Sequence, residues 1–191
     1  IARHLGLPTE GLPEPDHYTE GVVQVMLDAV GNKDNPLTHE RLHNWHAALF
    51  PTGRSGMYPI TVAAYRVGAE PMQVVSGAMG HERVHYQAPD SDDVPSMMDE
   101  FLAWVNRDVA IDPILKAAIA HIWFVSIHPF DDGNGRLTRT ITDMLLARAD
   151  ETPHRFYSMS AEILRERKGY YAALEKTTVG SMDITEWIEW F

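Results

Sequence analysis

Apolar residues recur along most of this chain at intervals of three and four positions, the spacing that places them on one face of an α-helix. The pattern predicts helices over residues 19–31, 38–49, 93–105, 113–127, 135–149 and 183–191, and a helix from residue 160 that residues 169–174 continue or restart. Asp112 and Pro113 form an N-cap and first-turn pair, and Ser160 is the expected cap of a later helix. Small residues at 117, 118 and 120 suit the centre of a bundle, so we expect a mostly α-helical fold.

A β-like segment interrupts the helical pattern between residues 68 and 89. Met72–Gly77 and Arg83–Gln87 flank a short turn, which predicts a β-hairpin. An isolated hairpin is marginally stable in water, so this one must rest on the helical body. A functional flap and a mere connector are the two interpretations.

The chain has 191 residues, enough for one domain with an ample core. We expect a single compact unit in which an N-terminal helical part, residues 1–54, packs on a core formed by residues 55–191. Hydrophobic residues make up 45% of the composition, and no apolar run approaches the roughly 18 residues of a membrane span. The composition therefore predicts a globular protein without membrane association.

Charge and cysteine content narrow the function further. Acidic residues outnumber basic ones by 27 to 16, which gives a formal net charge of −11 and argues against a nucleic-acid-binding surface. The chain has no cysteine, which excludes disulfides and fits a reducing, cytoplasmic location. An acidic protein that binds an anion must concentrate its positive charge locally.

Candidate functional side chains are densest between His128 and Arg139, where the chain reads His-Pro-Phe-Asp-Asp-Gly-Asn-Gly-Arg-Leu-Thr-Arg. Pro129 disfavours helical backbone at the residue before it, so the preceding helix must end there. Phe130 is the only large apolar residue of the turn and is expected to anchor it in the core. The glycines allow a sharp turn into a helix whose first amides can bind an anion.

Two arginines follow these glycines at i and i+3, on one face of the first helical turn. Cations are disfavoured at a helix N-terminus, so Arg136 and Arg139 indicate an anionic ligand, and a polyphosphate suits their planar donors. Asp132 would repel phosphates unless a hard cation such as Mg²⁺ lay between them. His128 remains as a candidate general base. An ordinary polar loop is the alternative, but the order of these residue types argues against it.

Four other histidines have helical spacing and could suggest further chemistry. His39, His43 and His46 recur at i, i+4 and i+7, a spacing that a transition metal could use. Without a nearby carboxylate partner, such histidines are more often surface or core residues. His121 lies seven residues before His128 and is interpreted as a buried structural residue.

The segment His128–Arg139 resembles the signature of the Fic family, His-Pro-Phe-x-Asp/Glu-Gly-Asn-Gly-Arg-x-x-Arg, and matches every fixed position. The resemblance implies a Fic-type helical bundle with a β-hairpin flap over the active site. It also implies an adenylyltransferase that moves AMP from ATP to a Ser, Thr or Tyr hydroxyl of a target protein and releases pyrophosphate.

The same resemblance implies a role for each signature residue. His128 would deprotonate the target hydroxyl, Asp132 would hold Mg²⁺, and Gly133, Asn134 and Gly135 would cradle the phosphates. Arg136 would stabilise the leaving pyrophosphate and Arg139 the terminal phosphate. Two further groups are implied outside the signature: Tyr170 and Tyr171 resemble a pair that lies over the nucleotide base, although an aromatic core is an equal alternative, and Met72, Gln73, Val74 and Val75 would dock the target by strand addition.

Regulation and partners are also expected from this resemblance. The first residues, Ile1–Leu7, are similar to the segment just beyond the inhibitory helix of larger bacterial Fic proteins, so an inhibitory helix is expected upstream of residue 1. The inhibitory Ser/Thr-x-x-x-Glu-Gly/Asn motif has no match in this sequence, which predicts an unrestrained fragment. A homodimer is compatible with the sequence. Removal of AMP by the same site, and a nucleotide-sensing module acting with a downstream DNA-binding domain, are the alternative functions.

Overall fold

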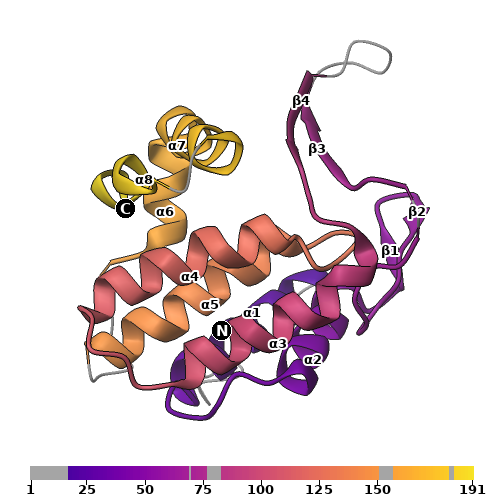
Figure 1. Cartoon of the computed structure of the whole chain (residues 1–191). Helices are drawn as coiled ribbons and strands as arrows, with labels where there is room; N and C mark the ends of the chain where they lie inside the picture. Colours follow the sequence, from indigo (N-terminus) through magenta and orange to yellow (C-terminus); the bar gives the residue numbers. More distant parts are fainter. Residues whose placement is uncertain (1–16, 69, 77–82, 151–156, 181–182) are drawn as a thin grey trace.

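The computed structural model describes residues 17–68, 70–76, 83–150, 157–180 and 183–191. Within these ranges it contains eight α-helices and two small antiparallel sheets, which confirms the mostly α-helical class (Figure 1). The helices are α1 (His17–Gly31), α2 (His39–Leu49), α3 (Val94–Asn106), α4 (Pro113–Ile127), α5 (Asn134–Ala149), α6 (Met159–Arg165), α7 (Arg167–Val179) and α8 (Thr185–Trp190).

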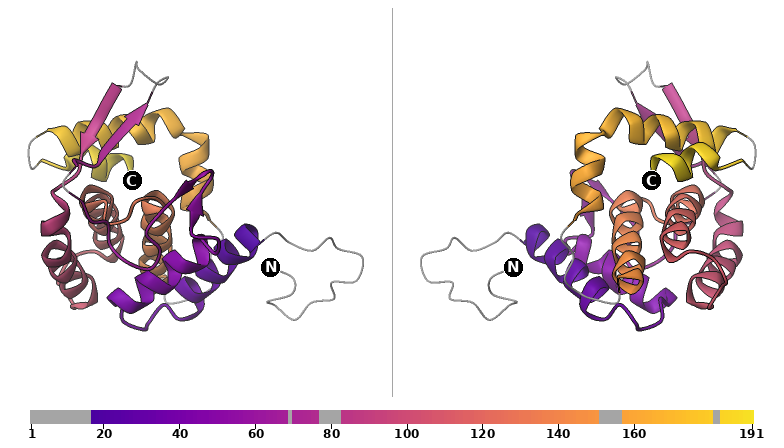
Figure 2. Two further views of the ribbon diagram at one scale, coloured as in Figure 1. Left: turned by 90° about the vertical axis from the view of Figure 1, so that its right-hand side faces the viewer. Right: turned by 90° about the vertical axis from the view of Figure 1, so that its left-hand side faces the viewer.

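Helices α4 and α5 form the centre of the molecule, and the other helices surround them (Figures 1 and 2). The Asp112 side chain caps α4 by accepting the Ile114 amide at 2.8 Å, as the sequence predicted. Ala117, Ala118 and Ala120 are all at most 1% exposed, so the neighbouring helices approach α4 closely. The expected central helix of the bundle is therefore confirmed.

Two hydrophobic clusters pack against this central pair. The larger cluster joins α1, α2 and α3 to α4 and α5. The smaller one joins α4 to α6, α7 and α8 around Trp187, whose indole N–H donates to the Ala118 carbonyl at 2.8 Å. The C-terminal helices are thus fixed to the same central helix whose end bears the candidate base.

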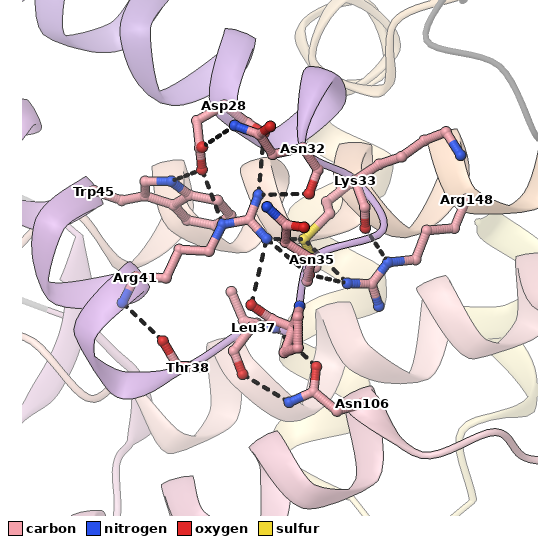
Figure 3. Close-up of polar contacts among 12 residues, drawn as sticks. Asp28, Asn32, Lys33, Asn35, Leu37, Thr38, Arg41, Trp45, Asn106 and Arg148 are labelled. Atoms are coloured by element: carbon pink, nitrogen blue, oxygen red, sulfur yellow. Dashed lines mark hydrogen bonds and ion pairs between the residues drawn. The ribbon is translucent and has the colours of Figure 1, made fainter.

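A polar cluster fastens α1 and α2 to the far end of α5 (Figure 3). The Asp28 carboxylate accepts the Arg41 Nε–H at 2.9 Å and the Trp45 indole N–H at 2.7 Å. Arg148 of α5 donates to the Asn35 carbonyl at 2.8 Å. Burial raises the pKa of Asp28, but the donors from Asn32, Arg41 and Trp45 outweigh it and lower the pKa below its ordinary value.

Two hairpins lie between α2 and α3. The short one pairs β1 (Arg54–Ser55) with β2 (Tyr58–Pro59). The longer one, here called the flap, pairs β3 (Gln73–Ser76) with β4 (Arg83–Gln87) and has a bulge between Val74 and Val75. The flap extends beside α7 (Figure 2), and the His85 ring lies 3.0 Å from the Glu175 carboxylate of that helix. The predicted hairpin is confirmed in its two strands, while its turn lies outside the described residues.

Three predicted helix starts differ from the structure. α8 begins at Thr185, two residues after the predicted start at residue 183. α1 begins at His17, two residues before the expected Thr19. Ser158, rather than Ser160, caps α6 by accepting the Ala161 amide at 3.2 Å, and a break at Glu166 separates α6 from α7. Either serine satisfies a capping pattern, and only the backbone entering the helix selects one. Among the residues that the structure describes, no helix combines the length and apolar character of a membrane span.

Candidate active site

The candidate active site is the corner between α4 and α5. His128 ends α4 in the left-handed region, at φ 51° and ψ 56°, a conformation that is uncommon for a residue with a Cβ. Phe130 is fully buried, as predicted. The Asn134 side chain closes the turn by accepting the Phe130 amide at 2.9 Å and donating to the Phe130 carbonyl at 2.7 Å. Two buried hydrogen bonds between the Asn134 side chain and the Phe130 backbone therefore hold the shape of the corner.

The imidazole of His128 is arranged as a proton acceptor. Its Nδ1–H donates to the Val125 carbonyl at 3.3 Å, which leaves Nε2 as the unprotonated nitrogen. Burial lowers the pKa of His128; the Val125 contact and the charge of Asp132 oppose this effect, and the charge of Arg66 adds to it. The net lowering keeps the ring neutral at pH 7, as a general base must be.

His128 opens into a pocket of about 580 Å³ between the flap and α7, here called the flap pocket. Gly135 and Arg139 of α5 line it, as do Val74 and Tyr86 of the flap. Tyr171 and Leu174 add apolar surface from α7. A pocket with a base, an arginine and an aromatic wall can hold an anionic ligand that also carries a ring.

Asp132 is held at a second pocket by three contacts. Its carboxylate accepts the Ser55 hydroxyl of β1 and the Gly133 amide. Its carbonyl accepts the His46 ring at 3.1 Å. This pocket has a volume of about 590 Å³ and is lined by Tyr18, Ser55, Asp132, Arg136 and Arg139 among others. We call it the Asp132 pocket; the fixed carboxylate and both arginines line it.

Asp131, the neighbouring acid, has a different environment. Its carboxylate accepts the Thr61 amide at 2.8 Å and lines neither the flap pocket nor the Asp132 pocket. The two adjacent acids therefore have separate partners, and only Asp132 is placed with the arginines.

The two glycines of the signature lie in different surroundings, so a side chain would have a different effect at each. Gly133 has φ 86°, and a Cβ there would lie 2.7 Å from Cε2 of Phe50. Gly135 lies in the first turn of α5, where a Cβ would meet only the guanidinium of Arg139, at 3.5 Å. Gly133 is thus required by the fold, whereas Gly135 leaves room beside an arginine at the helix N-terminus.

Arg136 and Arg139 lie on the same face, as their spacing predicted. The Arg136 guanidinium lies 5.2 Å from the Tyr18 ring and 4.4 Å from the Phe50 ring, and it donates to the Tyr18 hydroxyl at 2.9 Å. Arg139 makes no ion pair with a carboxylate of the described residues. It borders both pockets and a third groove, so its charge is available to a ligand in each.

The two tyrosines of the pair differ in exposure and in contacts. Tyr170 is 3% exposed, and its hydroxyl donates to Nε2 of His121, 3.0 Å away. His121 is fully buried, as predicted, and its Nδ1 lies 2.9 Å from the Thr142 hydroxyl. Burial raises the pKa of Tyr170 to about 12 and lowers that of His121 to about 3. Tyr171 is 53% exposed and borders the flap pocket together with Tyr170.

The expected target-docking residues, Met72 to Val75, lie at the start of the flap and in β3. Val74 lines the flap pocket, while Gln73 is exposed and pairs with Gln87. Met72 precedes β3, and its carbonyl accepts the Ala88 amide at 2.9 Å. The side chain of Val75 lies outside the described side chains. Target docking by this strand stays a prediction.

Three residues support the corner from distant parts of the sequence: His46, Ser55 and Arg66. His46 is fully buried and stacks on Phe130, with 4.2 Å between ring centroids. Its burial agrees with the expectation of a surface or core residue rather than a metal ligand, and the described residues contain no cluster of three histidine, cysteine or acidic side chains suited to a metal. Nothing in the local sequence around Ser55 or Arg66 links them to a signature more than 60 positions away.

Comparison with known proteins finds a matching family model and related sequences. The family model described as Fic/DOC family matches residues 36–146, more than half of the chain. Protein adenylyltransferase fic-1 of Caenorhabditis elegans is 34% identical over 91 residues, covering 47% of this chain and 17% of the relative. Protein adenylyltransferase Fic of Aedes aegypti is 42% identical over 67 residues, covering 34% of this chain and 13% of the relative.

Solved structures show the same fold. A Fic family protein from Desulfovibrio desulfuricans superposes with a TM-score of 0.69 at 21% identity, covering 99% of this chain and 53% of that one. Fic-1 of C. elegans superposes with a TM-score of 0.63 at 19% identity, covering 99% of this chain and 51% of that one. The chain thus corresponds to about half of each solved structure and to less than a fifth of each curated relative.

Fold and site together define an α-helical protein whose central helix pair presents a neutral histidine, a fixed carboxylate and two arginines at one corner. The chain belongs to the Fic/DOC family.

Proposed function

We propose that this protein transfers AMP from ATP to a hydroxyl side chain of a target protein. The observation that carries the proposal is the shared position of His128 and Arg139 in one pocket at the N-terminus of α5. The named adenylyltransferase relatives support the same reaction. In this reaction a base and a phosphate-binding cation must lie on either side of the reacting phosphorus.

The chemistry follows from the placement of these groups. His128 Nε2 takes the proton of the target hydroxyl, and the resulting oxygen attacks the α-phosphorus of ATP. The bond from that phosphorus to its bridging oxygen breaks, and pyrophosphate leaves with the electron pair. Arg136 and Arg139 and the first amides of α5 neutralise the phosphate charge, so catalysis is mainly by positioning and electrostatics.

A divalent cation fits the Asp132 pocket. Asp132 offers a hard carboxylate oxygen that is already oriented by Ser55 and Gly133, and Mg²⁺ in such sites takes one or two carboxylates plus phosphate oxygens. When bound, Mg²⁺ would supply charge neutralisation for the phosphates. Asp132 would hold it, and the Arg136 guanidinium lies near the rings of Tyr18 and Phe50 at the same pocket.

The groove between α1 and α6, of about 410 Å³, suits the inhibitory helix expected upstream. Val22, Met26 and Leu164 give it apolar surface, and Arg136 and Arg139 also line it. An amphipathic helix with one acid could cover the apolar surface and pair with an arginine. That pairing would compete with the terminal phosphates of ATP for the same charge.

The test is incubation of the chain with Mg²⁺ and ATP labelled at the α-phosphate, followed by intact mass measurement of the chain and of added candidate targets. We expect a gain of one AMP that His128→Ala abolishes without loss of nucleotide binding. Asp132→Asn and Asp131→Asn form a matched pair, and only the first should suppress transfer. Nucleotide binding without transfer would favour the sensing module, and release of AMP from a modified target would favour the reverse reaction.

A further inference from the structure

Each carbonyl at the C-terminal end of a helix needs a partner from outside the helical ladder. At the end of α4 two carbonyls have partners from distant segments. The Ser126 carbonyl accepts the Tyr86 hydroxyl of β4 at 2.6 Å, and the His128 carbonyl accepts Nε–H of Arg66 at 2.8 Å. The end of the helix that bears the base is therefore fastened to the flap region.

Arg66 is the central residue of this arrangement. It is only 4% exposed. Besides the His128 carbonyl, its guanidinium donates to the Pro89 carbonyl at 2.5 Å, and its backbone amide donates to the Pro129 carbonyl at 2.9 Å. No carboxylate of the described residues forms an ion pair with it. Three N–H donors of Arg66 therefore bind backbone carbonyls. Two of these carbonyls, those of His128 and Pro129, belong to the corner between α4 and α5.

Burial of this cation is costly unless its donors are used. Burial lowers the pKa of Arg66, while Tyr86, Asp131 and Asp90 act in the opposite direction; a guanidinium nevertheless stays charged at neutral pH. A buried apolar side chain would fill the same space at lower cost. What only arginine supplies is a planar fork that reaches two carbonyls of separate segments at once.

One of those segments is strained. A non-glycine residue in the left-handed region persists only where its surroundings determine it, and His128 has φ 51°. The other segment is the root of the flap, because Pro89 follows β4 by two residues.

We propose that Arg66 is a positioning residue that holds the His128 peptide in its left-handed conformation and ties it to the root of the flap. The catalytic meaning of this role rests on the proposed AMP transfer. The orientation of His128 does not depend on that reaction, because the hydrogen bonds alone determine it.

Arg148 provides a matched control within the same chain. It also joins backbone carbonyls of a distant segment, those of Lys33 and Asn35, from the C-terminal end of α5. Arg66→Lys and Arg148→Lys therefore both remove a forked donor and keep the positive charge. Only Arg66→Lys touches the corner, so a merely structural role predicts the same outcome for the two variants.

The experiment uses the full chain labelled with ¹⁵N-histidine, with the His128 signals assigned from His128→Gln. NMR measures the tautomer and pKa of His128 in the wild type and in both lysine variants. Arg66→Lys should weaken the preference for Nδ1–H and displace the His128 signals, whereas Arg148→Lys should leave them in place. Asp132 and Arg66 are the charged groups acting on this ring, and both lysine variants leave these charges present.

Activity gives the second measurement. Arg66→Lys should lower kcat for AMP transfer by about 10- to 100-fold, the loss expected when a catalytic group moves by about 1 Å, with little change in KM for ATP. Unchanged His128 signals and kcat in folded Arg66→Lys, or equal losses in Arg148→Lys, would overturn the proposal. If Arg66→Lys does not fold, Tyr86→Phe decides: it removes one hydroxyl from the same helix end, and unmoved His128 signals would count against the proposal.

The two proposals can fail separately. A wild-type chain that transfers no AMP would refute the proposed function, yet its His128 signals would still respond to Arg66→Lys if Arg66 positions the ring. An active wild type with unresponsive His128 signals would refute the positioning role alone.

Discussion

Gly133→Ala and Gly135→Ala should separate the folding requirement of the signature from its binding requirement. The two positions are two residues apart in the same Gly-Asn-Gly sequence. At Gly133 the backbone has φ 86°, and a Cβ would lie 2.7 Å from Phe50, which is 4% exposed. At Gly135 the nearest atom beyond the chain neighbours is a guanidinium nitrogen of Arg139 at 3.5 Å, an ordinary contact.

The magnitudes follow from these two environments. A left-handed alanine costs about 1–2 kcal/mol, and displacement of a packed aromatic ring costs about 1–3 kcal/mol more. Gly133→Ala should therefore lower the free energy of unfolding by about 2–5 kcal/mol. At this chain length a loss of 3 kcal/mol corresponds to a fall in Tm of about 6–12 °C. Gly135→Ala should be neutral or stabilising by up to about 1 kcal/mol, because alanine favours the helix.

Thermal and denaturant unfolding followed by circular dichroism measure both values, and ATP titration measures binding. Gly135→Ala should weaken ATP binding while keeping the Tm, because its methyl group enters the space beside Arg139. A Gly133→Ala variant as stable as the wild type would refute the steric reasoning at Phe50. A Gly135→Ala variant as unstable as Gly133→Ala would refute the contrast between the two positions.

Three further predictions concern hydrogen-bonded polar side chains. Tyr170→Phe should destabilise the fold by about 1–2 kcal/mol, because Nε2 of His121 loses its donor, while Tyr171→Phe should change it by less than about 0.5 kcal/mol; urea unfolding compares the two. The pKa of His121 is about 3 in the folded protein, against an ordinary value of 6.5. As the pH falls, the unfolded chain therefore protonates this imidazole at a higher pH than the folded protein does. Stability should therefore be full above pH 6.5 and decrease as the pH falls toward 3, and His121→Gln should flatten that dependence in unfolding measurements across pH 4–7. Asp28→Asn should cost about 2–3 kcal/mol at pH 7 by weakening charge-assisted bonds, a difference that should shrink as the pH falls through the lowered pKa of Asp28.

Local sequence was sufficient to predict the helices and the order of functional groups in the signature. Helical periodicity, an Asp-Pro start and a proline after His128 are short-range signals, and the structure places α4 and α5 as they indicated. Phe130 was predicted as the buried anchor because the turn offers one large apolar side chain. The residues that hold the corner were not predictable in this way: His46 and Arg66 act through contacts spanning 86 and 62 positions.

The tyrosine pair shows where a local pattern leaves a choice open. Adjacent helical residues point in different directions, but the sequence does not tell which one points inward. Packing of α7 against α4 and α8 settles this, because it buries Tyr170 beside His121 and leaves Tyr171 half exposed. The division of the chain at residues 54 and 55, and the individual catalytic roles of the signature residues, stay predictions.

The stacking of Phe130 on His46 has a consequence for how the protein folds. Helices α4 and α5 are neighbours in the chain and can pair through local contacts, which form early. The corner between them also needs Ser55, Thr61 and His46, each at least 70 positions away, and closing such long loops costs chain entropy. The helix pair can therefore form before its corner acquires the native shape. A truncated chain without α2 and β1 should keep the helical signal of α4 and α5 yet have no ordered corner.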